Sequence, residues 1–167
     1  LGCADSSGLL ALYVAEYKDI DWSTQVLDGD GKVAAWAMVA TKTFYKIQFD
    51  GTQAFYTATY TDDQGFYETL ATFIIDSKSK EGQDTVESLR NKCLVAHAFL
   101  LGGEEKIFGA ENIGGVWRPS LKRTKLGRHL DASGTPGSDK ARDEFDIIGS
   151  QVCAPLFGVV TEASMPV

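Results

Sequence analysis

Residues 84–115 read DTVESLRNKCLVAHAFLLGGEEKIFGAENIGG, and this stretch decides the fold. A short helical segment comes first, and an apolar run at residues 94–101 follows it at once. That run has no polar face and ends at a Gly-Gly-Glu-Glu turn before Lys106–Gly109, which predicts a β-hairpin. An isolated helix this short is unstable in water, so it is expected to pack against a sheet. The stretch therefore predicts a β-rich chain.

The helix prediction rests on a capping box. Asp84 is a typical N-cap residue, and Glu87, three residues later, is placed to reach back to it, an arrangement that contributes about 1 kcal/mol. We therefore expect the helix to begin at Thr85 and to span about residues 85–93. Its apolar side is one narrow stripe, consisting of Val86, Leu89 and Cys93.

Strand signals cover most of the remaining chain. Runs of β-branched, aromatic and alternating residues predict strands at residues 9–17, 43–49, 54–61, 66–75, 116–124 and 145–148. Residues 33–40 suit a helix or a strand, and the flanking glycines favour a strand. Asp50-Gly51 and Asp62–Gly65 predict tight turns, so residues 43–75 are expected to form a three-stranded meander.

Irregular segments are expected between these strands. Residues 78–83 are predicted to be a polar linker, residues 109–115 a loop, and residues 131–143 a long flexible loop. Pro119 confines its strand to a sheet edge or a bulge, because proline lacks the N–H group. We expect residues 1–167 to form a single mainly β domain, a β-sandwich or half-barrel of antiparallel strands with one short flanking α-helix.

Composition narrows the class of protein. The 167-residue chain is 44% hydrophobic, which is ordinary for a globular domain, and its formal net charge is −7. An acidic chain is not built to neutralise phosphates, although nucleic acid can slide past it without adhering. No run approaches the roughly eighteen apolar residues of a membrane span, so we expect a soluble protein that has no membrane partner.

No motif indicates an active site, and we predict no catalytic residues, no cofactor and no metal site. The two histidines, His97 and His129, are the only possible imidazole bases, and His97 in mid-strand is expected to be structural. The three cysteines are widely spaced and predict neither a disulfide framework nor a zinc site. Neighbouring carboxylates such as Glu104-Glu105 and Asp143-Glu144 are expected to lie in solvated turns.

One feature stands out against the acidic background. Five cations lie within eleven residues that contain no acid, and we call them the basic strip: Arg118, Lys122, Arg123, Lys125 and Arg128. The strip is either a solvated strand face or a subunit interface that meets an acidic face of the next copy. Under the interface hypothesis, charge reversal at Lys122 and Arg123 prevents assembly and leaves the fold intact.

The order of features over residues 40–157 resembles that of small β-rich virion proteins of tailed bacteriophages. The resemblance rests on the meander, the linker, the capped helix with its LVA-like strand, the Gly-Gly turn, KIFG and the late loop before DEFDIIGSQ. It is greatest to tail tube proteins of phages with Bacteroidetes-type hosts. The resemblance implies a homo-oligomeric ring, typically a hexamer, stacked into a virion tail that forms a DNA conduit without specific DNA binding. It also implies other virion proteins as partners and assembly in the host cytoplasm, and we place the basic strip at the subunit interface.

Two other classes remain open. The first is a capsid decoration or neck protein, which would share the β fold but differ in symmetry. The second is a β-sandwich surface protein that binds carbohydrate or peptide, in which the three tryptophans would form a platform: Trp22, Trp36 and Trp117. An enzyme ranks third.

Overall fold

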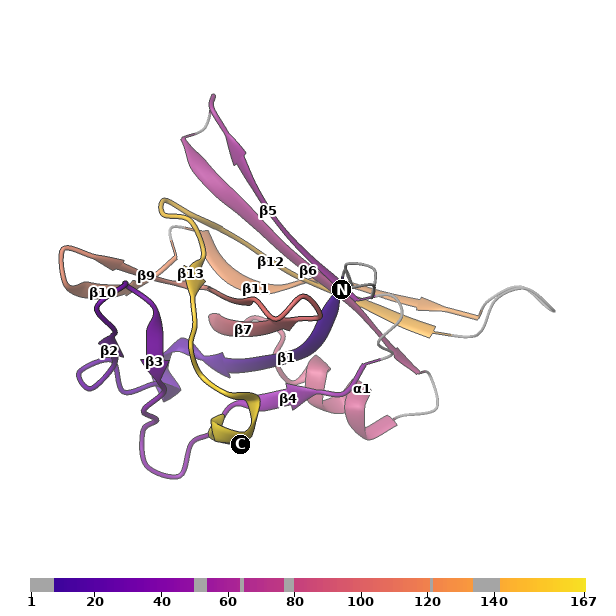
Figure 1. Ribbon diagram of the computed structural model, residues 1–167. Coiled ribbons are helices and arrows are strands. Elements are labelled where there is room, and N and C mark those ends of the chain that lie inside the picture. The colour runs from indigo at the N-terminus through magenta and orange to yellow at the C-terminus, as the bar shows by residue number, and fades with distance from the viewer. Residues whose placement is uncertain (1–7, 50–53, 64, 77–79, 121, 134–141) are drawn as a thin grey trace, which may run out of the picture.

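The computed structural model describes residues 8–49, 54–63, 65–76, 80–120, 122–133 and 142–167. Within them the chain forms two main antiparallel sheets, two small two-stranded sheets and one short α-helix (Figure 1). The two main sheets contribute to a common apolar core. The predicted mainly β fold with one short flanking helix is therefore confirmed.

The larger sheet has five strands in the order β13-β8-β7-β1-β4. Its strands are β1 (Leu9–Glu16), β4 (Tyr45–Ile47), β7 (Leu94–Leu100), β8 (Glu105–Phe108) and β13 (Leu156–Phe157). The predicted hairpin in the opening stretch is confirmed as β7 and β8, which pair from Ala96↔Phe108 to Phe99↔Glu105.

The second sheet has four strands in the order β11-β12-β6-β5. Its strands are β5 (Phe55–Thr61), β6 (Phe66–Asp76), β11 (Lys122–Ala132) and β12 (Arg142–Gln151). The small sheets are formed by β2 (Val26–Leu27) with β3 (Val33–Ala35) and by β9 (Ala110–Ile113) with β10 (Val116–Pro119). The helix α1 spans Lys80–Glu87, and 3₁₀ turns span Tyr17–Asp19 and Glu162–Ser164.

The main core lies between the two sheets. On β6 and β12 the inward residues include Phe73 and Phe145, which are fully buried and stack with ring centroids 5.6 Å apart. They belong to one cluster with Leu12 of β1, Leu94 of β7 and Phe108 of β8. At about 2 kcal/mol for each buried large apolar side chain, this shared layer is the main reason the sheets stay together.

The five-stranded sheet is covered on both faces. Its second face packs against another apolar cluster, which includes Val33 of β3 and Val160 and Met165 of the C-terminal segment. Strands buried on both faces read as continuous apolar runs instead of alternations. This explains why β1 and β7 have no polar face in the sequence.

The helix begins five residues before its predicted start. Asp84 lies inside α1, and its carbonyl accepts the N–H of Ser88 at 3.0 Å, so the prediction that Asp84 is the N-cap is wrong. The Thr85 hydroxyl donates to the Glu81 carbonyl at 2.8 Å, a side-chain contact typical of a helix interior. A capping-box pattern specifies a local bond, but it does not exclude an earlier helical turn.

The predicted apolar stripe is confirmed for two of its residues. Val86 is fully buried in α1, and Leu89 is buried in the turn that follows it. The Leu89 N–H donates to the Val86 carbonyl at 3.0 Å, three residues back, so after Glu87 the backbone forms turns instead of continuing the α-helix. Cys93 is only partly buried, and its carbonyl accepts the Tyr17 N–H at 2.8 Å.

The predicted three-stranded meander is wrong. β4 pairs with β1, as in Leu12↔Ile47, and therefore belongs to the five-stranded sheet. Only β5 and β6 form the expected hairpin, with continuous pairing from Phe55↔Thr72 to Thr61↔Phe66. Turn signals specify a local reversal but not the partner of each strand. The expected turn at Asp50-Gly51 lies outside the described residues.

Three further boundaries differ from expectation. Residues 109–115, predicted to be a loop, include β9. Gly109, just before it, adopts φ +102°, and a Cβ there would collide with the Leu94 carbonyl, so this position requires glycine. The predicted loop at residues 131–143 is strand at both ends, and residues 134–141 lie outside the described part of the chain. Of the ambiguous run at residues 33–40, only Val33–Ala35 is a strand.

Candidate assembly surface

The two main sheets end in very different edge strands. The edges of the five-stranded sheet are β13 and β4, with two and three residues, whereas those of the four-stranded sheet are β5 and β11, with seven and eleven. Among the described residues, β5 and β11 each have a sheet partner on one side only. Short edge strands protect a sheet from pairing with other chains, and long ones do not. The four-stranded sheet is therefore the candidate assembly surface.

β5 is an unprotected edge. Its sequence FYTATYT contains no charge, no proline and no glycine, and its register with β6 has no bulge. Thr57, Ala58 and Thr59 are exposed. Natural sheets place charges, prolines or bulges on free edges to prevent pairing, and β5 has none of them.

Aromatic side chains add exposed apolar surface to this edge. Phe55 and Tyr60 are 45% and 52% exposed, and Tyr60 packs against Tyr67 with ring centroids 5.2 Å apart. Tyr56 points inward instead and stacks on Phe108 at 5.3 Å, and burial raises the pKa of its hydroxyl above the usual value. The strand therefore combines one anchored ring with two exposed ones.

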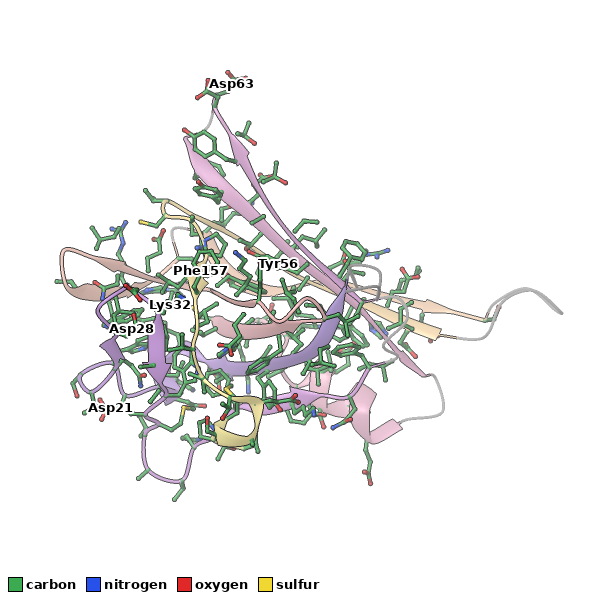
Figure 2. The ribbon with its side chains drawn as sticks, in the orientation of Figure 1. Asp21, Asp28, Lys32, Tyr56, Asp63 and Phe157 are labelled. Carbon is green, nitrogen blue, oxygen red and sulfur yellow. The ribbon has the colours of Figure 1, made fainter. Side chains whose placement is uncertain are left out.

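The β5–β6 hairpin ends in an acidic turn. Asp62 and Asp63 are exposed there, and Figure 2 shows Asp63 at the tip of the hairpin, away from the body of the molecule. Residue 64 is outside the described part of the chain.

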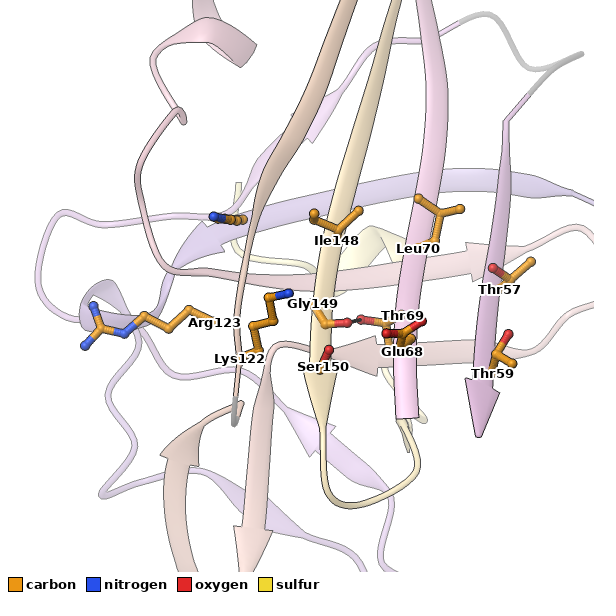
Figure 3. A pocket seen from close by; sticks show the side chains of 11 residues that line it. Thr57, Thr59, Glu68, Thr69, Leu70, Lys122, Arg123, Ile148, Gly149 and Ser150 are labelled. Carbon is orange, nitrogen blue, oxygen red and sulfur yellow. Dashed lines mark hydrogen bonds between the residues drawn. The ribbon is translucent and has the colours of Figure 1, made fainter. Parts of the chain in front are cut away.

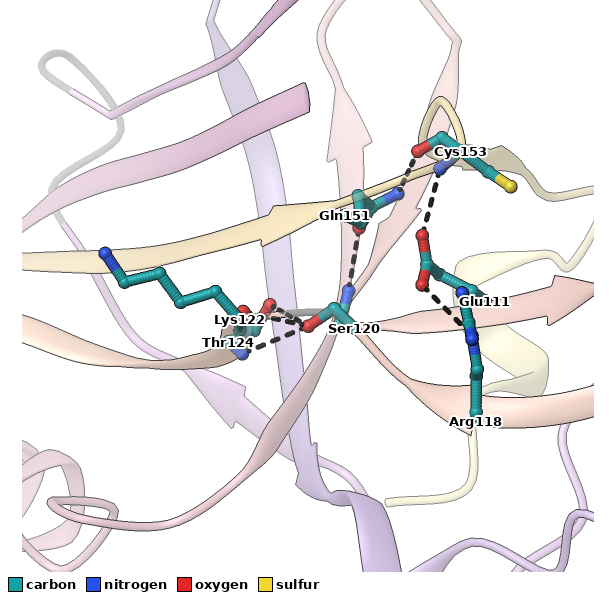
Figure 4. Close-up of polar contacts among 8 residues, drawn as sticks. Glu111, Arg118, Ser120, Lys122, Thr124, Gln151 and Cys153 are labelled. Carbon is teal, nitrogen blue, oxygen red and sulfur yellow. Dashed lines mark hydrogen bonds and ion pairs between the residues drawn. The ribbon is translucent and has the colours of Figure 1, made fainter. Parts of the chain in front are cut away.

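The basic strip lies mainly on β11, the opposite edge of this sheet. Arg118 is on β10, and the other four cations are on β11. The pairing of β11 with β12 shifts register twice, between Lys122 and Lys125 and between Leu126 and Arg128. The beginning of β11 is held by the Ser120 hydroxyl, which accepts the Thr124 N–H at 3.2 Å (Figure 4).

Two residues of the strip have intramolecular partners. Arg118 Nε lies 3.6 Å from the buried carboxylate of Glu111, whose other oxygen accepts the Cys153 N–H at 2.9 Å (Figure 4). Arg128 bonds Asp146 at 2.7 Å and Glu144 at 3.2 Å, and the hydrogen bond to Asp146 is the main cause of its raised pKa. These two cations already neutralise acids of their own chain.

The other three residues of the strip are exposed. Among the described residues, no ion pair involves Lys122, Arg123 or Lys125. Figure 3 shows the Lys122 side chain directed towards β12 and Arg123 pointing away from it. Burial raises the pKa of the nearby Cys93 thiol, and the charge of Arg123 offsets part of that rise. These three charges are available to another molecule.

A shallow groove of about 320 Å³ crosses the outer face of this sheet (Figure 3). Its walls are Lys122 and Lys125 on one side and Thr57, Thr59 and Glu68 on the other. The outer face also bears the pairs of Arg128 with Asp146 and Glu144. Positive and negative groups are thus balanced on this face.

His97 is a buried structural residue. The Trp36 indole N–H donates to its Nδ1 at 2.9 Å, which places the imidazole proton on Nε2, 3.2 Å from Glu105 Oε2. Burial lowers the pKa of His97 to about 4, so the neutral ring donates to Glu105, whose own pKa burial raises. Glu105 is on β8, so the prediction that it lies in a solvated turn is wrong.

His129 joins three elements. Its Nδ1 lies 2.5 Å from Glu87 of α1 and its Nε2 lies 2.6 Å from the buried Asp143 of β12. The ring stacks on Phe145 with centroids 4.4 Å apart. Asp143 and Glu144 lie on opposite faces of β12, so their prediction as solvated turn residues is also wrong. Sequence reasoning missed these contacts because no periodicity relates α1 to β11.

The three tryptophans do come together, as the carbohydrate hypothesis required. Trp22 lies 4.9 Å from Trp117 and 6.1 Å from Trp36 between ring centroids. They pack on the second apolar cluster, and the indole N–H groups of Trp22 and Trp36 donate to Tyr17 and His97. This arrangement favours a packing role for the three rings.

Among the described residues, no group of three or more His, Cys, Asp or Glu side chains is placed to hold a metal ion. In the same part of the chain, no helix has the length and hydropathy needed to cross a bilayer. Comparisons with protein-family models, with curated proteins and with solved structures gave no match.

Proposed function

We propose that this protein is a structural subunit that joins with copies of itself, edge to edge, into rings that stack as a tube of the phage tail type. The observation that carries the proposal is β5, a seven-residue edge strand without charge, proline or bulge that has no partner on its outer side among the described residues. In a stable monomer such an edge invites aggregation, and pairing with a neighbouring copy removes it.

Strand direction supports a ring. All pairings in the four-stranded sheet are antiparallel, so β5 and β11, its first and last strands, run in opposite directions. When β5 of one copy lies beside β11 of the next, the sheet continues as an antiparallel sheet. The two edges differ, so the contact is head-to-tail, and it forms a closed ring when the rotation between neighbouring copies divides a full turn evenly.

Charge is compatible with a conduit for nucleic acid. The chain carries a net charge of −7, and the outer face of the four-stranded sheet balances its acids and bases. A wall built from that face would offer no dense cationic surface to hold phosphates. Nucleic acid would therefore pass without specific binding.

The test is a variant that protects β5. Thr57→Lys with Thr59→Lys places two charges on the free edge and opposite the cations of the neighbour's β11. Size-exclusion chromatography with light scattering should show rings or polymers for the wild type and monomers for the variant. Circular dichroism should be unchanged, because both threonines are exposed.

A matched control carries the same charge elsewhere. Ala34→Lys with Ala40→Lys also adds two lysines, at exposed positions outside the four-stranded sheet, and should assemble like the wild type. Negative-stain images distinguish stacked rings from the other symmetries expected of a decoration or neck protein. A wild-type protein that stays monomeric at high concentration contradicts the proposal.

A further inference from the structure

We propose that Asp62 and Asp63 at the hairpin tip of one copy pair with Lys122 and Arg123 of the next copy, forming an electrostatic latch between subunits. This inference rests on the proposed function, because it specifies how β5 and β11 of two copies recognise each other. The partner is a second copy of this chain.

Sheet geometry places the two charged pairs at the same end of the sheet. Thr59 is paired with Glu68, Glu68 with Ser150, and Ser150 with Lys122, so all four lie in one row across the sheet. The acidic turn follows Thr61 at this end of β5, and Lys122 begins β11 at the same end. When a neighbouring β11 continues the sheet beyond β5, its basic beginning therefore lies beside the acidic turn.

The charged side chains of the latch are available for such a contact: Asp62, Asp63, Lys122 and Arg123. Each of them is exposed, and among the described residues none takes part in an ion pair. Arg118 and Arg128, by contrast, neutralise acids of their own chain. The latch thus uses two of the three cations of the basic strip that have no ion pair among the described residues.

The latch also distinguishes this contact from pairing between two like edges. Two β5 edges that paired antiparallel would put their acidic turns at opposite ends of the contact, so neither turn would meet Lys122 or Arg123. Two β11 edges would leave the acidic turns out of the contact altogether. Lysines and bulges on an edge normally discourage pairing, and the acidic turn offsets this only where it lies beside the start of β11.

The test is a charge swap between two variants. Variant A carries Asp62→Lys and Asp63→Lys, and variant B carries Lys122→Glu and Arg123→Glu. Each alone should raise the protein concentration needed for assembly at least tenfold, because its tip and its strip now carry the same charge. An equimolar mixture should assemble at close to the wild-type concentration, in open chains or even-numbered rings in which A and B alternate.

Neutral variants guard against misfolding. Asp62→Asn with Asp63→Asn, and Lys122→Gln with Arg123→Gln, remove the charges without repulsion and should give intermediate assembly with unchanged circular dichroism. The latch is overturned if A or B alone assembles like the wild type, or if their mixture stays monomeric while the wild type assembles. A monomeric wild type would instead overturn the proposed function itself.

Discussion

At the scale of single residues, buried polar groups connect parts of the chain that are far apart in sequence. His97 on β7 bonds Trp36 and Glu105, and Glu105 also accepts the Val160 N–H at 3.2 Å. These contacts hold the C-terminal segment against the five-stranded sheet. Because His97 has no exposed surface, its protonation must oppose folding.

We expect His97 to make stability depend on pH. Its pKa is about 4 in the folded protein and about 6.5 when unfolded, so the unfolded state binds the proton more readily between those values. The free energy of unfolding should therefore fall as pH drops from 6.5 to 4, by at most about 3 kcal/mol. The raised pKa of Glu105 acts in the opposite direction and reduces this loss.

Urea unfolding at several pH values, at a protein concentration that keeps the sample monodisperse, measures this effect. His97→Gln retains a neutral acceptor for the Trp36 indole and should flatten the dependence between pH 6.5 and 4. An imidazole of His97 that titrates near pH 6.5 by NMR would contradict the prediction.

At the scale of secondary-structure elements, α1 is tied to the four-stranded sheet by one apolar and one polar anchor. Val86 is fully buried in the main core, and Glu87 contacts His129 of β11. The helix is short and contains Gly82, so intrinsic propensity contributes little to it. Its position therefore depends on these two contacts.

His129→Ala should loosen the helix end. The substitution removes the contacts with Glu87 and Asp143, which should cost about 1–2 kcal/mol for contacts of this partly buried kind. Hydrogen exchange of the Ser88 and Leu89 amides should accelerate about tenfold, as measured by NMR or mass spectrometry.

Arg90→Ala is the matched control for this change. It removes another partner of Glu87, an exposed i,i+3 pair at 2.6 Å, which contributes about 0–1 kcal/mol. If His129→Ala and Arg90→Ala accelerated hydrogen exchange of these amides equally, His129 would not be the polar anchor of the helix.

At the scale of the whole molecule, the proposed latch makes assembly depend on charge. A latch between exposed groups is screened by salt, with a Debye length of about 10 Å at 0.1 M and about 3 Å at 1 M. The repulsion between copies of net charge −7 is screened as well, which favours assembly at high salt. In the wild type, salt screens both the latch and the repulsion between copies. In a variant without the latch, salt screens only the repulsion.

The salt dependence of assembly should therefore differ between the wild type and a variant that lacks the latch. Raising sodium chloride from 50 mM to 500 mM should weaken assembly of the wild type relative to the variant with Lys122→Gln and Arg123→Gln by several-fold. Light scattering across a concentration series measures both thresholds. Parallel curves for the two proteins would mean that the strip is only solvated.

Much of the β architecture was predictable because its signals are local. The apolar runs of β1 and β7, the FYTATYT strand before the acidic turn, and the glycines after residue 101 each specify an element through neighbouring residues. The basic strip was also visible in the sequence as a composition shift. Its division into paired and unpaired cations was not, because Glu111 and Asp146 reach it only through sheet pairing.

The sequence by itself determined the class of the fold, most of its strands and the two charged segments, since periodicity, turn residues and charge act over a few residues. Only the tertiary structure decided that β4 joins β1, where α1 begins, and which strands of the four-stranded sheet are its edges within the described part of the chain. Those outcomes depend on apolar burial and hydrogen bonds between residues far apart in the chain. A pattern of neighbouring residues cannot predict the energies of such long-range contacts.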